Sequence, residues 1–130
     1  ADNCRTFAVT EPDAFQQLAW ESLMNVFEYV ESNVKPGKNC RELFAEVQAI
    51  LDDCPVGQFD HHLGHGIGLF PHEAPHLNPT WDDCFEFGDV FTAEPGLYAP
   101  DQLRAGMRIE NNYVVTDTGV RNLTPFAMEL

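Results

Sequence analysis

Two stretches in the first half of the chain carry hydrophobic residues at the spacing of amphipathic helices. In the first stretch the apolar positions recur every three or four residues, up to a stop at Lys35-Pro36-Gly37. Thr10 is the predicted N-cap of this helix, with Pro12 and Asp13 in its first turn. The apolar positions are Phe15, Leu18, Ala19, Leu23, Val26, Phe27 and Val30.

The second helical stretch has a clear start and a clear stop. Asn39, followed three residues later by Glu42, is typical of a helix N-cap. The segment Cys54-Pro55-Val56-Gly57 ends the pattern. One face of the predicted helix is apolar and consists of Leu43, Phe44, Val47, Ile50 and Leu51.

Short runs of β-branched and aromatic residues predict strands in much of the remaining chain. The predicted strands are residues 5–10, 90–94, 107–116 and 120–123, with a turn at Asp117-Thr118-Gly119. Residues 77–88 are polar and contain proline, which indicates a loop with solvated charges at Asp82, Asp83 and Glu86. Two helices and several strands in 130 residues predict one α+β domain.

All five histidines fall within a single segment, residues 61–76, together with three glycines. If this segment is a strand, its side chains alternate between two faces. The glycine face has no side chains, so another backbone or a ligand can approach it closely. One face would carry His61, Leu63, His65, Ile67 and Leu69, and the other His62, Gly64, Gly66 and Gly68.

Two familiar motifs fit this segment poorly. His72-Glu73-Ala74-Pro75-His76 has the HExxH pattern of helical zinc peptidases, but Pro75 disfavours a helix by about 3 kcal/mol. The glycines are spaced GxGxG rather than GxGxxG, and Pro71 prevents a helix from following directly, which disfavours a dinucleotide-binding loop. The segment could also be a glycine-rich turn whose histidines have no function. That explanation suits one or two histidines better than five.

Composition excludes some partners. A net charge of −14 disfavours binding to nucleic acid or to an anionic membrane. Cysteines 4, 40, 54 and 84 form no CxxC pair, so we expect free thiols and a cytoplasmic location. The sequence contains no apolar run long enough for a membrane span or signal peptide. A start at Ala1 rather than methionine suggests a fragment or a processed product.

Two carboxylates stand out within apolar strand patterns. Glu94 ends an otherwise apolar strand, and Glu110 lies among hydrophobic residues, where burial without a partner is costly. A salt bridge with Arg108, on the same predicted strand face, would explain Glu110 alone. Two such glutamates near a histidine cluster point instead to a metal, for which His65, Glu94 and Glu110 would form one ligand set.

Several motifs, in matching order along the whole chain, resemble the C-terminal half of the pita-bread metallopeptidases. This group comprises methionine aminopeptidase and the Xaa-Pro dipeptidases and aminopeptidases, and creatinase-like enzymes share its fold. The opening ADNCRT is similar to the family's S-D-x-T-R-T strand. The R-I-E string at Arg108 and the closing LTPFAMEL resemble the proline-specific branch. The other matching strings are GHGIGLFPHEAP, FTAEPGLY and GMRIENNYVVTDTGVRNLTP.

The resemblance implies a role for particular residues. Asp2 and Glu110 would bridge two divalent ions (Mn, Co or Zn), and His65 and Glu94 would bind one of them. Metal-activated water would hydrolyse the peptide bond, with Glu94 transferring a proton and His72 stabilising the intermediate or the substrate. His61 would either contact the substrate or support a metal ligand through a hydrogen bond. Arg108 would orient Glu110 or a substrate carboxylate.

The resemblance also implies that the chain is incomplete. Another aspartate ligand of the family lies in a D-x-G strand before the S-D-x-T-R-T strand, and Cys4 replaces a threonine of the latter. Residues 1–130 would then be the C-terminal part of a catalytic domain, with two helices on a curved, mainly antiparallel sheet. We expect at most one bound metal, no peptidase activity from this chain alone, and dimerisation through exposed apolar surface.

The function implied for the parent protein is metal-dependent cleavage of Xaa-Pro bonds in short peptides with proline at the second position. Two alternatives remain open. One is a non-peptidase member of the fold, either a creatinase-like hydrolase or a sulfoniopropionate lyase. The other is a binding module without catalytic activity.

Overall fold

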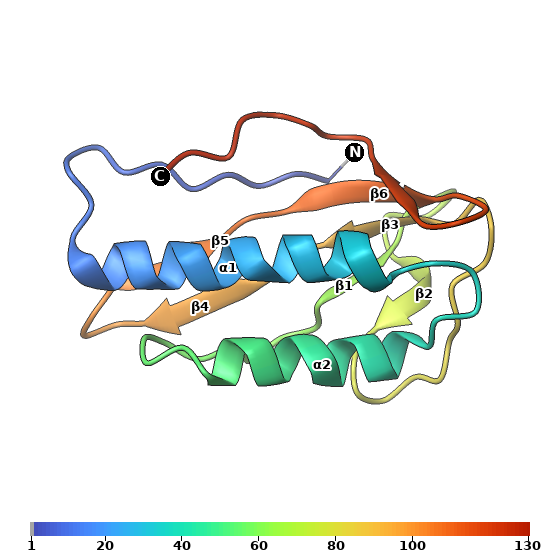
Figure 1. Cartoon of the computed structure of the whole chain (residues 1–130), viewed down its shortest axis with the longest axis horizontal. Coiled ribbons are helices and arrows are strands. Elements are labelled where there is room, and N and C mark those ends of the chain that lie inside the picture. Colours follow the sequence, from blue (N-terminus) through green and yellow to red (C-terminus); the bar gives the residue numbers. More distant parts are fainter. Residues whose placement is uncertain (1) are drawn as a thin grey trace.

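The computed structural model describes residues 2–130 and places two helices beside two antiparallel sheets (Figure 1). Figure 1 shows that the helices α1 and α2 lie side by side and run in opposite directions. None of the helices in the described residues is long and apolar enough to cross a bilayer. The helices are α1 (Ala14–Asn33) and α2 (Cys40–Asp52). The strands are β1 (Gly64–Gly66), β2 (Glu73–Leu77), β3 (Val90–Ala93), β4 (Gly96–Ala99), β5 (Ala105–Arg108), β6 (Asn111–Val115) and β7 (Val120–Asn122).

Helix α1 begins three residues later than the sequence pattern predicted, because its N-cap is Asp13 and not Thr10. The Asp13 carboxylate accepts a hydrogen bond from the Gln16 backbone N–H at 2.9 Å. The Gln16 side chain in turn accepts one from the Asp13 backbone N–H at 2.9 Å. This reciprocal capping box satisfies two backbone donors, which Thr10 lies too far upstream to do.

Helix α2 begins where the sequence predicted. Asn39 is its N-cap, and the side-chain oxygen accepts a hydrogen bond from the Glu42 backbone N–H at 3.0 Å. Residues at helical spacing bury one face of α2, whereas Phe44 and Ile50 are only partly buried at the edge of the core. The fully buried positions are Cys40, Leu43, Val47 and Leu51.

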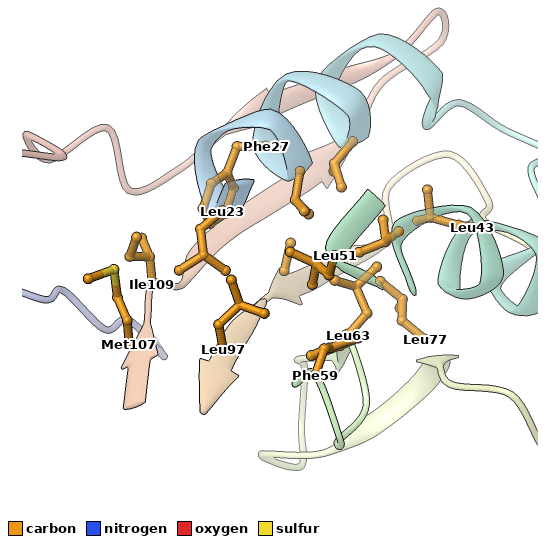
Figure 2. Packing of buried hydrophobic residues seen from close by; sticks show 14 of the residues in the cluster. Leu23, Phe27, Leu43, Leu51, Phe59, Leu63, Leu77, Leu97, Met107 and Ile109 are labelled. Carbon is orange, nitrogen blue, oxygen red and sulfur yellow. The ribbon is translucent and has the colours of Figure 1, made fainter. Parts of the chain in front are cut away.

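The hydrophobic core fills the space between the helices and the sheets (Figure 2). Figure 2 shows side chains of α1, such as Leu23 and Phe27, and Leu51 of α2 lying against residues of the strands and loops. The strand and loop residues labelled there are Phe59, Leu63, Leu77, Leu97, Met107 and Ile109. This packing fixes the strands, and therefore the residues at their ends, relative to the helices.

The larger sheet has five strands in the order β2-β1-β3-β6-β7, and β4 and β5 form a separate two-stranded sheet. Every pairing between strands is antiparallel. The predicted strand 107–116 is therefore two strands: β5 pairs with β4, and β6 pairs with β3. Glu110 lies at the junction where the chain leaves one sheet for the other. The expected α+β class with an antiparallel sheet is confirmed.

The predicted strand at residues 5–10 is wrong. Within the described residues only Cys4 forms a bridge here, with Glu110, and Phe7 and Val9 are exposed. Arg5 instead fastens the segment, because its guanidinium donates to the Glu110 carbonyl and, at 3.0 Å, to the carbonyl of Thr124. A run of β-branched and aromatic residues does not form a strand without a neighbouring strand to pair with.

The histidine segment forms strand β1 and, from Glu73 onward, strand β2, and the glycines of β1 allow close backbone approach. A Cβ atom on Gly64 would lie 1.9 Å from the Thr92 carbonyl oxygen, and one on Gly66 would lie 2.0 Å from that of Ala74. Both glycines are therefore required for β1 to fit between its neighbours. Residues 73–77 form strand β2, which agrees with the rejection of a helical HExxH site.

The predicted loop between residues 77 and 88 is confirmed from Asn78 onward, but the charge of Asp83 is paired with His76 and only partly exposed. The Asp83 carboxylate accepts hydrogen bonds from the backbone N–H and from Nδ1 of His76, both at 2.8 Å. These bonds lower the pKa of Asp83 against the opposing effect of burial. Asp82 pairs with Arg41 at the surface, where such a bridge contributes little to stability.

Candidate metal centre

Antiparallel pairing brings together carboxylates and imidazoles from distant parts of the sequence. His65 is the central residue of β1, Glu94 directly follows β3, and Glu110 directly precedes β6. Strand β3 pairs with both β1 and β6, so these three residues meet at one place in the sheet. All three are buried, with 5%, 6% and 2% of their surfaces exposed.

His65 is oriented so that Nε2 faces the carboxylates. Its Nδ1 atom lies 3.1 Å from the Gly66 carbonyl oxygen, which can only accept, so Nδ1 carries the proton. Nε2 then offers its lone pair, 3.4 Å from Glu94 Oε1 and 3.9 Å from Asp2 Oδ2. Burial lowers the pKa of His65, although the hydrogen bond to Gly66 opposes this effect. The neutral imidazole is the form that binds metal ions.

The two oxygens of Glu94 have different partners. Oε1 lies 3.0 Å from Nε2 of His62, and Oε2 lies 3.5 Å from a guanidinium nitrogen of Arg108. Among the described residues Arg108 forms no salt bridge with Glu110, which the strand pattern had suggested as its partner. Strand alternation does not apply between these residues, because β5 ends at Arg108 and the chain changes sheets before Glu110.

Glu110 is the least favourable residue of the cluster in a protein without metal. Its Oε1 atom is buried and has no hydrogen-bond partner among the described residues. Burial, together with the negative charges of Glu94 and Asp2, raises the pKa of Glu110 from 4.5 to about 7. The backbone holds it in place, because its N–H donates to the Cys4 carbonyl at 2.9 Å. A divalent cation would supply the missing partner and offset the repulsion, so these residues fit a metal.

His72 approaches the cluster from the exposed segment between β1 and β2. Its ring centroid lies 3.8 Å from that of His65. Asp2, His65 and His72 each offer one ligand atom within 4.8 Å of the others. The distances thus allow His72 to act as a ligand or as a catalytic group, and its catalytic role stays a prediction.

His61 lies beside the candidate metal ligands and contacts Tyr98. Its Nε2 atom is 2.9 Å from the Tyr98 hydroxyl, and its Nδ1 atom is 2.7 Å from the His62 carbonyl oxygen. The Tyr98 ring lies over Gly106, where an added Cβ would come within 2.2 Å of Cδ1 of the ring. Tyr98 therefore fixes the orientation of His61. The Tyr98 ring can take its place only because Gly106 has no side chain.

A cleft of about 350 Å³ opens over the cluster. It contains every predicted site residue except Glu110, which is buried beside it. A larger hollow of about 480 Å³ lies elsewhere and is lined by acidic residues without an imidazole, so we place the site in the smaller cleft. The residues lining this cleft are Asp2, His61, His62, His65, His72, Glu94 and Arg108.

Sequence reasoning missed two residues of the site. His62 was placed on the opposite face from His65, because alternation was extended through residues that are not in a strand. Tyr98 was assigned to none of the predicted strands, but it lies in β4. The glycines at positions 96 and 106 were a usable signal, since both lie against the Tyr98 ring.

A set of buried carboxylates and imidazoles that converge in an open cleft is typical of metal centres, including those of metal-dependent hydrolases. The profile of metallopeptidase family M24 matches residues 1–117, and the chain belongs to this family. The predicted resemblance to the pita-bread metallopeptidases is thereby confirmed.

Relatives with curated descriptions carry the resemblance over the whole chain. The Xaa-Pro dipeptidase of Pyrococcus furiosus is 33% identical over 131 residues, which cover 100% of this chain and 37% of the relative. The Xaa-Pro dipeptidase of Lactobacillus delbrueckii subsp. lactis is 35% identical, over 100% of this chain and 35% of the relative. The chain thus spans little more than a third of the length of these relatives.

Solved structures agree with the fold. The prolidase from Pyrococcus horikoshii OT3 superposes with a TM-score of 0.90 at 32% identity, covering 98% of this chain and 37% of the prolidase. The Xaa-Pro dipeptidase from Bacillus anthracis gives a TM-score of 0.91 at 34% identity, covering 100% and 36%. The X-Pro aminopeptidase from Thermotoga maritima MSB8 gives 0.90 at 29% identity, covering 99% and 36%.

Proposed function

We propose that residues 1–130 are the C-terminal part of the catalytic domain of a metal-dependent Xaa-Pro dipeptidase or aminopeptidase. The observation that carries the proposal is Glu110, a buried carboxylate without a partner, placed beside Glu94 and Asp2. Such a cluster destabilises a protein unless a cation binds it. The named activities of the relatives support the same reaction, and their greater length supports a larger domain.

In this proposal Asp2, Glu110, His65 and Glu94 would hold the divalent ions of the complete domain, with Asp2 and Glu110 shared between two ions and His65 and Glu94 serving one. The ions are manganese, cobalt or zinc. Divalent ions held by such ligands make water more acidic and polarise a peptide carbonyl. The second ion needs a further aspartate, which residues 1–130 do not supply, so this chain alone binds at most one ion and has no peptidase activity.

The protein side chains supply proton transfer and orientation. Glu94 transfers the proton, and the Arg108 contact to its Oε2 atom leaves Oε1 facing the imidazoles. His72 lies at the open side of the cluster, where it hydrogen-bonds the tetrahedral intermediate or the substrate. His61 is held by Tyr98 at the wall of the cleft and contacts the substrate.

The substrate is a short peptide with proline at its second position. The cleft volume of about 350 Å³ is near the lower end of the roughly 300–1,000 Å³ typical of small-molecule sites. The Arg108 side chain is 43% exposed in this cleft. A guanidinium suits the carboxylate of a dipeptide, because its N–H groups bind both carboxylate oxygens.

The proposal is tested by joining this chain to the part of a catalytic domain that it lacks. In the Pyrococcus furiosus Xaa-Pro dipeptidase, the segment that this chain matches is replaced by residues 1–130, and hydrolysis of Xaa-Pro dipeptides is measured. We expect turnover that a chelator abolishes and manganese, cobalt or zinc restores. Folded, metal-loaded chimera without dipeptidase activity would contradict the proposal, and creatinase-like activity that survives the chelator would favour that alternative.

Two further features belong to the proposal. We place the protein in the cytoplasm because its cysteines form no CxxC pair, and the four free cysteines support this proposal. A homodimer is expected from exposed apolar side chains such as Phe7, Val9 and Phe126, which are 67%, 98% and 64% exposed.

A further inference from the structure

His62 lies in the cleft and has no role in the proposed function. Its Nε2 atom is 3.0 Å from Oε1 of Glu94, and Nε2 of His65 is 3.4 Å from the same oxygen. One carboxylate oxygen thus lies between two imidazole nitrogens. His62, His65 and Glu94 each offer one ligand atom within 4.8 Å of the other two.

These separations match those between ligands that share one ion. A tetrahedral zinc site with bonds of about 2.0–2.1 Å holds its ligand atoms about 3.3 Å apart. The observed distances of 3.0 and 3.4 Å lie on either side of that value. The third separation, between the donor nitrogens of His62 and His65, is within 4.8 Å, so all three distances are compatible with one shared ion.

The surroundings leave the three donor atoms available. His65 keeps Nε2 free because its Nδ1 proton is directed to the Gly66 carbonyl. Arg108 contacts the other oxygen of Glu94, and apart from the imidazoles Oε1 has a long hydrogen bond of 3.5 Å from the Thr92 hydroxyl, which an ion can displace. The His62 side chain is 43% exposed, so its ring can adjust to an ion without displacing core residues.

A competing set of donors shares His65, but its donors are more exposed and farther apart. It consists of Asp2, His65 and His72. The Asp2 side chain is 49% exposed and its Oδ2 atom is 3.9 Å from His65 Nε2. In the His62 set, by contrast, the Glu94 side chain is 7% exposed and its Oε1 atom is 3.4 Å from His65 Nε2.

We infer that His62, His65 and Glu94 form a three-donor site that binds one divalent transition-metal ion within this chain. Two imidazoles and one carboxylate favour zinc or cobalt over magnesium or calcium, which prefer oxygen ligands. The inference rests on the proposed function in sharing His65 and Glu94, and it adds His62 as a ligand. The site requires neither Asp2 nor a donor from outside residues 1–130.

The test is a cobalt titration of the metal-free 130-residue chain, followed by visible absorption, with zinc competition to give the affinity. His62→Gln is expected to weaken binding on the order of a hundredfold and to change the cobalt spectrum. His76→Gln is the matched control, because this imidazole is bonded to Asp83 outside the cleft. It should leave both the affinity and the spectrum unchanged.

A second measurement avoids mutation altogether. Zinc added to the unmodified chain should shift the 15N resonance of His62 Nε2, together with that of His65, and leave His76 unchanged. If zinc binds through His65 while the His62 resonance and the His62→Gln affinity stay the same, the inference is wrong and the proposed metal centre stands. Weaker binding in Asp2→Asn and His72→Gln, with His62→Gln unaffected, would assign the ion to the competing set.

Failure of the proposed function would give a different experimental result from failure of the three-donor site. It would appear in the chimera as a lack of metal-dependent dipeptide hydrolysis, whatever the isolated chain binds. Absence of any zinc or cobalt binding by the isolated chain overturns the three-donor site and leaves the chimera assay to decide the function.

Discussion

Replacing the buried carboxylate of Glu110 with an amide should stabilise the metal-free chain at high pH. Burial and the charges of Glu94 and Asp2 raise the pKa of Glu110 from 4.5 to about 7. The folded state therefore holds the proton between these two pKa values, while the unfolded state releases it. Stability falls as pH rises from about 4.5 to about 7 and is constant above that range.

The size of the effect follows from the pKa difference. One pKa unit corresponds to about 1.4 kcal/mol, so ionised Glu110 costs the fold about 3 kcal/mol at pH 8. At pH 5 the same relation gives less than about 1 kcal/mol. Glu110→Gln removes this charge and should raise the free energy of unfolding by up to about 3 kcal/mol at pH 8, with little change at pH 5.

Urea unfolding of the metal-free chain at pH 5 and pH 8 measures this difference directly. The control is Glu28→Gln, which neutralises an exposed glutamate on α1 and should change stability by less than about 0.5 kcal/mol at either pH. Zinc should stabilise the unmodified chain more than Glu110→Gln if Glu110 is a ligand. Equal stability of the two proteins at pH 8 would refute the argument that Glu110 is buried at a cost.

Three other outcomes follow from the site and the fold. In the chimera, His65→Ala should lower metal content, whereas His72→Ala should keep the metal and reduce turnover by roughly a hundredfold or more; equal metal loss in both would contradict the division of roles. Gly106→Ala should destabilise the chain by about 1–3 kcal/mol in urea unfolding, because its Cβ would lie 2.2 Å from the Tyr98 ring. Gly119→Ala, which meets only one atom at 3.9 Å, is its control, and equal stabilities would remove the argument for a fixed Tyr98. Sedimentation should show a dimer, and a monomer at all concentrations would disprove that expectation.

The helices were the most predictable part of the fold, because their signals are local. Asn39 sets the start of α2 through a bond to a backbone group three residues away, which a sequence pattern can express. The start of α1 was missed because Thr10 and Asp13 both suit an N-cap. Only the reciprocal bonds of Asp13 with Gln16 decide between them.

The strands were less predictable because their limits depend on distant partners. The run at residues 107–116 is continuous in sequence, yet β4 and β3 pair with its two halves in different sheets. Residues 5–10 have strand-like composition, but Arg5 directs the segment through bonds to Glu110 and Thr124 instead. Pairing of this kind is decided by tertiary contacts rather than by local preference.

The site was predictable to the extent that it violates the local pattern. Glu94 and Glu110 were noticed because a carboxylate in an apolar strand needs a partner. His62 was missed because the argument from alternation holds only inside a strand, and β1 is three residues long. Arg108 contacts Glu94 because the chain leaves the β4–β5 sheet before Glu110. The sequence does not show this change of sheet.

Glu110 connects the fold to the proposed chemistry. Its backbone N–H donates to the Cys4 carbonyl, and its carbonyl accepts from Asn3 and Arg5. These bonds come from a segment about a hundred residues earlier and fix the backbone of Glu110, so the start of its side chain is held at a buried position. The fold therefore maintains a buried charge that disfavours folding in the absence of metal. A local conflict that the surrounding structure enforces is expected at a functional site, where binding of an ion resolves it.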